Sequence, residues 1–186
     1  MEQTKKVRLT FFSSGYCESH ANIVNPRSGK GKCNFYAVWA LIHCPENGYI
    51  LFDTGYSQYF NKATDSFPDR FYRWATPMFL NDGESAKEIL NKKGITASEV
   101  KYIIVSHFHA DHIGGLLDFP AATIICSKEA YNEAVTLKGI RAVSKGVLSK
   151  LLPSIKNTQI QFIEEIASTR NINEAGIIEY SLLNIK

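Results

Sequence analysis

The sequence predicts a single domain of the layered α/β class. Three observations support this prediction: short β-branched and aromatic runs recur along the chain, segments with helical spacing follow several of them, and turns rich in glycine or proline separate them. A length of 186 residues suits one domain, spanning residues 1–186, and is long enough to bury a sizeable core.

The first half of the chain is expected to supply three neighbouring strands. VRLTFF (7–12), FYAVWALIHC (35–44) and GYILFDTG (48–55) are rich in β-branched and aromatic residues, and PENG carries turn chemistry between the last two. Strands this close together predict an antiparallel meander. Residues 56–83 are rich in aromatics without a clear period, so we expect them to be irregular.

The second half is expected to alternate helices and strands. Apolar residues recur at helical spacing from Ser85 to Gly94, and this glycine suits the end of a helix. VKYIIVSH (100–107) is typical of a strand buried on both faces. Further elements are expected along the rest of the chain: a short helix at 111–118, a strand at 123–127, a helix at 128–137, helical character at 143–152 and a strand at 158–165.

Composition excludes several classes of protein. The formal charge is only +3 and the basic residues are scattered, which argues against a nucleic-acid binder. The apolar runs are too short for a membrane span, and the N-terminus lacks the pattern of an export signal. Four cysteines, at 17, 33, 44 and 126, include no C-x-x-C pair, which predicts reduced thiols in a cytoplasmic protein.

The stretch SHFHADHIGG (106–115) predicts a metal site. Three of the five histidines lie there, directly after the strand expected at 100–107. In extended backbone His107 and His109 project to the same side and can converge on one ion. Asp111 and His112 follow where the chain turns into a helix and suit a second ion. Imidazole with carboxylate favours zinc, with manganese or iron as alternatives. Asp111 could instead serve only as a helix N-cap.

The pattern H-x-H-x-D-H-x-G-G after a hydrophobic strand resembles the signature of the metallo-β-lactamase superfamily. Asp53 in LFDTG resembles a second element of that family, and the resemblance extends over residues 35–135. The stretches ALIHCPENGYILFDTGYS and DHIGGLLDFPAATIICSKEAY are most similar to the lactonase-like branch, which includes N-acyl homoserine lactonases. The resemblance implies an αββα sandwich.

The resemblance also implies a chemistry. Family members hold two zinc ions about 3.5–4 Å apart, and a zinc-bound hydroxide attacks the carbonyl of a small lactone or ester. His107, His109, Asp111 and His112 would be metal ligands, and Asp111 would also be catalytic. Asp53 would orient the metal-binding loop, unless it is merely a turn residue. A glyoxalase-II-like thioesterase is the alternative hydrolase, and a homodimer stays open.

The ligand count departs from the family pattern. The family takes a further histidine, a bridging aspartate and another histidine downstream of the motif, but no histidine or aspartate follows Asp118. His20 and His43 precede the cluster. Four downstream glutamates are conceivable replacements, but we expect them on a solvated surface; they are Glu164, Glu165, Glu174 and Glu179.

Three explanations stay open for this shortage. The chain is a fragment, which we favour, is completed by a partner chain, or is an inactive member that binds metal only weakly. We therefore expect only the N-terminal part of the sandwich, with sheet edges and apolar surface exposed.

Overall fold

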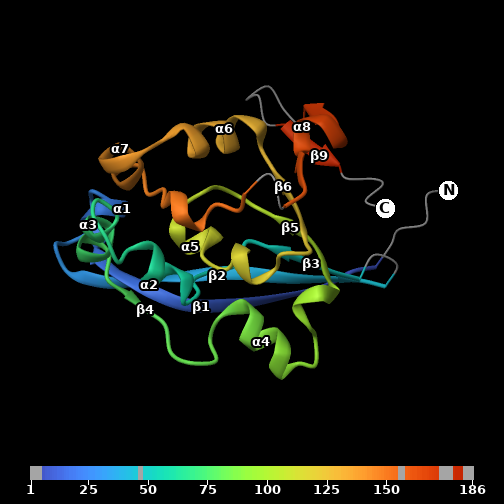
Figure 1. The fold of residues 1–186 in the computed structure, drawn as a ribbon, viewed down its shortest axis with the longest axis horizontal. Helices are drawn as coiled ribbons and strands as arrows, with labels where there is room; N and C mark the ends of the chain where they lie inside the picture. The colour runs from blue at the N-terminus through green and yellow to red at the C-terminus, as the bar shows by residue number, and fades with distance from the viewer. Residues whose placement is uncertain (1–5, 46–47, 155–157, 172–177, 182–186) are drawn as a thin grey trace.

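A computed structural model describes residues 6–45, 48–154, 158–171 and 178–181. Its centre is a seven-stranded sheet with the strand order β4-β1-β2-β3-β5-β6-β7 (Figure 1). The bounds of these strands are Arg8–His20 for β1, Lys32–Cys44 for β2, Gly48–Phe52 for β3, Met78–Phe79 for β4, Val100–Ile104 for β5, Thr123–Cys126 for β6 and Ile160–Phe162 for β7. The mixed α/β class predicted from the sequence is confirmed.

The first three strands form the expected antiparallel meander. β1 pairs with β2 and β2 pairs with β3, so that Phe11, Ala40 and Phe52 lie side by side across the sheet. Both β1 and β2 are longer than predicted. They continue past the sheet as a ribbon whose tip carries the short helix α1 (Ala21–Val24), and the sequence analysis missed this extension.

The remaining central strands are parallel. β3 pairs with β5, β5 with β6 and β6 with β7. Parallel neighbours need crossover connections, which here contain helices. These are α4 (Ala86–Lys92) before β5, α5 (Ala110–Ile113) before β6, and α6 (Lys128–Thr136) with α7 (Gly139–Ser144) before β7. Because the carboxyl ends of parallel strands meet at one edge, the loops after β3 and β5 come together there.

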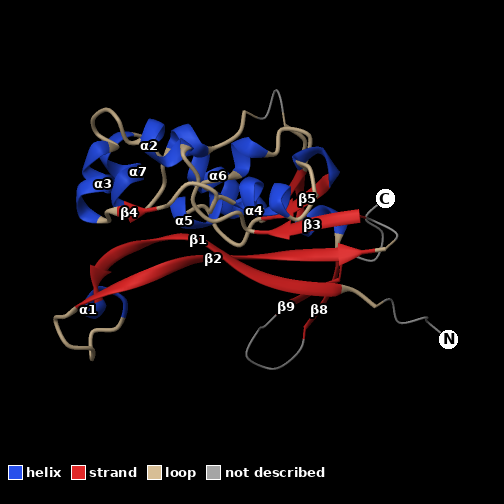
Figure 2. Ribbon diagram, turned by 90° about the horizontal axis from the view of Figure 1, so that it is seen from below, coloured by secondary structure: helices blue, strands red, loops and turns tan. Residues whose placement is uncertain are grey.

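Helices cover one face of the sheet. Figure 2 shows α2 to α7 on one side of β1 and β2. The main core lies between these layers, and its largest fully buried side chains include Trp39, Tyr56, Phe60, Phe119 and Leu51. Buried Trp39 donates from Nε1 to Ser14 Oγ over 2.7 Å, so its one polar atom is satisfied inside the core.

The opposite face of the sheet is apolar and partly open. Leu9, Phe11, Val38 and Phe52 are between 42% and 66% exposed there. Toward β5 and β6 this face is better covered: Ile50, Tyr102 and Ile125 are buried, and Ile163 of α8 (Ile163–Ile166) packs against them. The hairpin of β8 (Ser168–Asn171) and β9 (Ile178–Ser181) lies on this side of β1 and β2 (Figure 2). Apolar surface was expected to be exposed, and the described residues show it.

Several element predictions need correction. The segment 56–83 is not wholly irregular, because it contains α2 (Tyr59–Ala63), α3 (Arg70–Ala75) and β4. The aromatic rings of this segment pack edge to face on one another and on the core instead of forming a single amphipathic stripe, so the sequence showed no helical period for the two short helices. The helical signal at 143–152 corresponds to α7, which ends at Ser144, and a 3-10 helix at Ser149–Leu151. The strand expected at 158–165 gives way to α8 after Phe162.

Other element predictions are confirmed. Helix α4 begins with a capping box between Ser85 and Glu88, and Gly94 follows its end with φ of +77°. β6 and α6 lie where the sequence placed them. The four cysteines are free thiols. Among the described residues, no helix is both long and apolar enough to cross a membrane.

The glycine pair after the histidine cluster lies in close contact with the chain that follows β3. A Cβ added to Gly114 would lie 2.8 Å from the carbonyl oxygen of Gly55 and 2.9 Å from the Cα of Tyr56. A Cβ on Gly115 would approach Thr54 to 3.1 Å. The two glycines therefore allow α5 to lie close to the chain that follows β3.

Gly114→Ala should lower the free energy of unfolding by about 1–3 kcal/mol, because backbone atoms have to move to admit the methyl group. Urea denaturation would measure this loss. Gly31→Ala is the control, since nothing lies within 4 Å of its added Cβ, and we expect a change within about 0.5 kcal/mol. Equal effects of the two substitutions would contradict the packing argument.

Candidate metal centre

The loop that links β5 to α5 carries His107 and His109. β5 ends at Ile104, so the predicted strand is three residues too long and the two histidines are not placed by strand alternation. Their rings are nevertheless adjacent, with centroids 4.6 Å apart and planes at 71°. His109 keeps an extended backbone directly before the helix. The two side chains lie next to each other as expected, but the loop after β5 places them there, and not the alternation of a strand.

Helix α5 carries the other two predicted ligands. His109 occupies the N-cap position and Asp111 lies in the first turn, so the interpretation of Asp111 as an N-cap is wrong. His112 Nε2 is 3.3 Å from Asp111 Oδ2, and the His112 ring lies 3.9 Å from the His107 ring, centroid to centroid. The structure thus brings all four predicted site residues into one cluster.

Asp53 lies behind this cluster at the end of β3, with only 3% of its side chain exposed. One carboxylate oxygen accepts a hydrogen bond from the backbone N–H of Ser106 over 2.8 Å. The other lies 2.7 Å from Nδ1 of His112. A buried carboxylate is costly unless it is paired and hydrogen-bonded, and this one is both. Asp53 therefore contacts the loop and a predicted ligand directly, so it is more than a turn residue.

Ser106 links the cluster together, and the sequence analysis missed it. Its hydroxyl lies 2.7 Å from Asp53 Oδ2, 3.0 Å from His107 Nδ1 and 3.2 Å from His112 Nδ1. One short side chain thus contacts the carboxylate and two imidazoles. A hydroxyl residue directly before the motif was the only available signal, and nothing in its spacing predicted a role.

The electrostatics of the cluster favour a charge on His112. Burial acts to lower its pKa, but the hydrogen bonds that the ring donates to Asp111 and Asp53, and the charges of these two residues, outweigh burial and raise the pKa to about 9. For Asp111, burial acts to raise the pKa, and the bond and charge of His112 lower it overall. Burial, with the neighbouring His112 and His109, lowers the pKa of His107. In the absence of a metal ion, the side chains of Asp111 and Asp53 thus favour a proton on His112.

Asp111 also interacts electrostatically with three polar side chains whose closeness the sequence did not indicate. Burial raises the pKa of Tyr56, Tyr72 and Cys17, and the charge of Asp111 raises each of them further. Cys17 shares a hydrogen bond with Tyr56. Along the sequence, Cys126 is the cysteine nearest the motif. In the structure, however, the charge of Asp111 acts on the thiol of Cys17 in β1. A residue 94 positions away (111 − 17) carries no local signal of this closeness.

The donor types suit a divalent ion, but the donor count is short. Three imidazoles and a carboxylate are the chemistry that zinc takes in proteins. Across the described part of the chain, however, no three His, Cys, Asp or Glu side chains are arranged so that they could hold one ion. His112 has both ring nitrogens directed at carboxylates, Asp53 and Asp111.

The other candidate donors lie elsewhere. His20 Nδ1 contacts the carbonyl oxygen of Lys30 at the ribbon tip, and His43 stacks on Tyr49. Glu164 and Glu165 are exposed and hydrogen-bond to Lys128, as expected of a solvated surface. Glu174 lies outside the described residues, and only the backbone of Glu179 is described.

Two cavities adjoin the cluster. One, of about 250 Å³, is lined by His107, His109, Glu133 and Lys145 among others. The second, of about 630 Å³, lies between α3 and α7 and is lined by Phe71, Tyr72 and Val143 with His109 and Lys145. His109 and Lys145 thus border both spaces. The volume and the apolar lining of the second cavity are typical of a small-molecule site.

Comparison with known families decides the relationship. A model of the metallo-beta-lactamase superfamily matches residues 28–171, most of the chain. The chain belongs to this superfamily. The match includes the whole histidine cluster, Asp53 and the crossover between them.

Individual superfamily members are similar to this chain over part of their length. An N-acyl homoserine lactonase of Bacillus thuringiensis is 29% identical over 128 residues, which cover 69% of this chain and 51% of the lactonase. The chain therefore spans about half the length of the curated relatives it matches.

Solved structures of the superfamily share the fold. An N-acyl homoserine lactone hydrolase with N-hexanoyl-L-homoserine at its catalytic metal centre superposes with a TM-score of 0.68 at 24% identity. This match covers 92% of the present chain and 64% of the hydrolase. AidC, a dizinc quorum-quenching lactonase, gives a TM-score of 0.55 at 19% identity over 87% of this chain and 59% of its own. The metallo-β-lactamase fold expected from the sequence is confirmed.

Asp53→Asn should lower the pKa of His112 in metal-free protein, because the amide keeps the shape of the side chain and removes its charge. The pKa of His112 is about 9 in the folded state and about 6.5 in the unfolded state. Protonation of His112 therefore stabilises the fold, and this contribution is complete below pH 6.5. That contribution is lost as the pH rises through 9. NMR titration of the His112 ring and urea unfolding at pH 6 and pH 9 would measure both effects.

The pH dependence of stability should be shallower in Asp53→Asn than in the parent protein over this range. Asparagine tolerates the left-handed backbone of Asp53, where φ is +59°, so strain does not obscure the comparison. His43→Gln is the control, since this ring stacks on Tyr49 far along β2. An unchanged His112 titration in Asp53→Asn would rule out the proposed pairing.

Proposed function

We propose that this chain is a metal-dependent hydrolase that opens the carbonyl–oxygen bond of small lactones or esters, of the N-acyl homoserine lactone type. The observation that carries the proposal is the contact cluster of His107, His109, Asp111 and His112 at the carboxyl edge of the parallel strands. The relationship to lactonases supports the substrate class.

The metal that suits this donor set best is zinc, with manganese or iron as alternatives. His107 and His109 would hold one ion, and Asp111 with His112 would hold a second. Bound there, an ion supplies Lewis acidity: it acidifies a water molecule and polarises the carbonyl of the substrate. A dizinc centre in the structural neighbour AidC supports this choice of metal.

The side chains of this chain have distinct tasks in the proposed reaction. Asp53 and Ser106 fix the ring orientations of His112 and His107 through the hydrogen bonds already described. Burial lowers the pKa of His107 and so favours its neutral, metal-binding form. Asp111 keeps a lowered pKa, so that its carboxylate is ionised at neutral pH and can accept a proton from the attacking water.

The cavities support a substrate with an apolar arm. The larger one has Phe71, Tyr72 and Val143 in its wall and reaches His109 at one end. An acyl chain lying along these side chains would place a carbonyl group beside the histidine cluster. Lys145, which borders both cavities, would face polar groups of the substrate near the same point.

A second candidate function follows from the short donor set. Among the described residues, no three donors gather at one position. The competing proposal is therefore a non-catalytic protein that binds metal weakly, or only together with a partner chain. Catalytic zinc sites usually carry three protein ligands. Zinc content per chain after dialysis separates the two proposals: about two ions support the hydrolase, and none supports the alternative.

The hydrolase is tested directly by zinc-dependent ring opening of N-hexanoyl homoserine lactone, measured as acid release, with an acyl thioester of glutathione in parallel. Faster turnover of the thioester would favour the glyoxalase-II-like alternative. Asp111→Asn should lower kcat/KM by about 100-fold or more, because it removes the proton acceptor. His20→Gln, which changes an exposed ring at the ribbon tip, should leave the rate unchanged. No zinc-dependent turnover of either substrate would overturn the proposal.

A further inference from the structure

The backbone of Gly146 lies against the ring of His109. A Cβ added to this glycine would lie 2.7 Å from Cδ2, 2.9 Å from Nε2 and 3.2 Å from Cγ of that ring. These are the three nearest heavy atoms, so the imidazole occupies the space that any side chain at position 146 would take. The φ of Gly146 is +75°, in the region where glycine is the favoured residue.

His109 differs from the other two histidines in how it is held. His112 contacts Asp53, and His107 contacts Ser106, through a ring nitrogen. Within the described residues, the His109 ring forms no hydrogen bond; it packs edge to face on the His107 ring and lies against Gly146. Metal-binding histidines commonly gain their orientation from a hydrogen bond at the second nitrogen. For His109, packing has to supply that orientation.

The segment around Gly146 is firmly anchored. The N–H of Gly146 donates to Val143 over 3.0 Å and that of Val147 to Ala142 over 2.9 Å, which closes the end of α7. The next apolar side chains are buried; they are Val147, Leu148 and Leu151.

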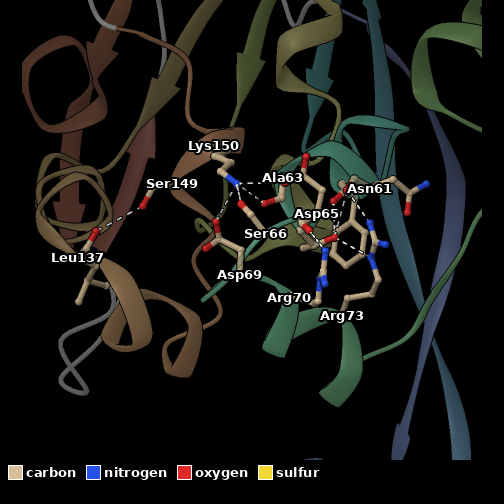
Figure 3. A network of polar contacts seen from close by, with 12 residues as sticks. Asn61, Ala63, Asp65, Ser66, Asp69, Arg70, Arg73, Leu137, Ser149 and Lys150 are labelled. Carbon is tan, nitrogen blue, oxygen red and sulfur yellow. Dashed lines mark hydrogen bonds and ion pairs between the residues drawn. The ribbon is translucent and has the colours of Figure 1, made fainter.

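Lys150 ties the same segment to the loop after α2. Figure 3 shows its ammonium group among Ala63, Ser66 and Asp69. It donates to Ser66 Oγ over 2.7 Å and to the carbonyl oxygen of Ala63 over 3.2 Å, and it lies 3.4 Å from carboxylate oxygens of Asp65 and Asp69. Two sets of contacts therefore hold the segment that meets His109: the backbone hydrogen bonds at the end of α7 and the contacts of Lys150 with the loop after α2.

We propose that Gly146 is a positioning residue for His109: its bare Cα forms the surface that fixes the imidazole beside His107. The consequence for metal binding rests on the proposed function, in which His109 is a ligand. The positioning itself does not, because it can be observed in metal-free protein. Any side chain at position 146 would push the ring away from the cluster.

The experiment compares Gly146→Ala with Gly139→Ala. Gly139 also has a positive φ, +59°, but nothing lies within 4 Å of its added Cβ. Both variants carry backbone strain, and only the first carries the collision with His109. In metal-free parent protein, NMR should show a nuclear Overhauser effect between the His109 ring and the Gly146 α-protons. The ring signals of His109 should shift in Gly146→Ala and stay in place in Gly139→Ala.

Zinc affinity, measured by competition with a chromophoric chelator, gives the second readout. Gly146→Ala should lower it by about 10- to 100-fold, the usual effect of losing a group that orients a ligand, and Gly139→Ala should leave it within about twofold. If the parent protein binds no zinc, the proposed function fails, while the NMR comparison still decides the role of Gly146.

A second variant guards against failure of Gly146→Ala to fold. Lys150→Met keeps the glycine and removes the ammonium group that anchors the segment. We expect the His109 ring signals to broaden or move, with a smaller loss of zinc affinity in the same direction. Lys92→Met is the matched control, because Lys92 donates to Gly83 in the α4 region instead. Unmoved His109 signals in both Gly146→Ala and Lys150→Met would overturn the proposal.

Discussion

The arrangement of the site depends on one buried carboxylate. Asp53 directly follows the last residue of β3. Its N–H donates to the carbonyl oxygen of Ile104 over 2.8 Å and so extends the pairing of β3 with β5 by one residue. Its side chain then reaches Ser106 and His112. The next residue continues this contact, since Thr54 donates to His112 from both its N–H and its hydroxyl. The strand end and the metal-binding loop therefore form one hydrogen-bonded unit, and the histidines take their places from it.

The motif itself could be predicted because its signals are local. Three histidines and an aspartate within six positions, followed by two glycines, predicted the cluster. Asp53 was found through a second short motif. Ser106, Cys17 and Gly146 could not be predicted in this way. Their roles depend on which parts of the chain meet in space, and a serine, a cysteine or a glycine in isolation has no spacing that predicts a contact.

The same distinction separates the elements that were predicted well from those that were not. Long apolar strands and the capped helix α4 carry strong periodic signals, and they were found with small errors at their ends. α2 and α3 are five and six residues long, too short for a helical period to appear. Their aromatic side chains pack on each other and on the core, so tertiary contacts hold the helices more than local preference does. The extent of the ribbon formed by β1 and β2 is likewise fixed by pairing across the hairpin.

The bond between Asp53 and His112 also bears on how the chain reaches its native state. The two residues lie 59 positions apart, and they meet only after β3 and β5 have paired in parallel across the intervening crossover. Closing so long a loop costs conformational entropy before any contact repays it, so such pairings form slowly. A ligand that recognises the assembled cluster stabilises only the native state. It would consequently lengthen the lifetime of the folded chain more than it would hasten folding.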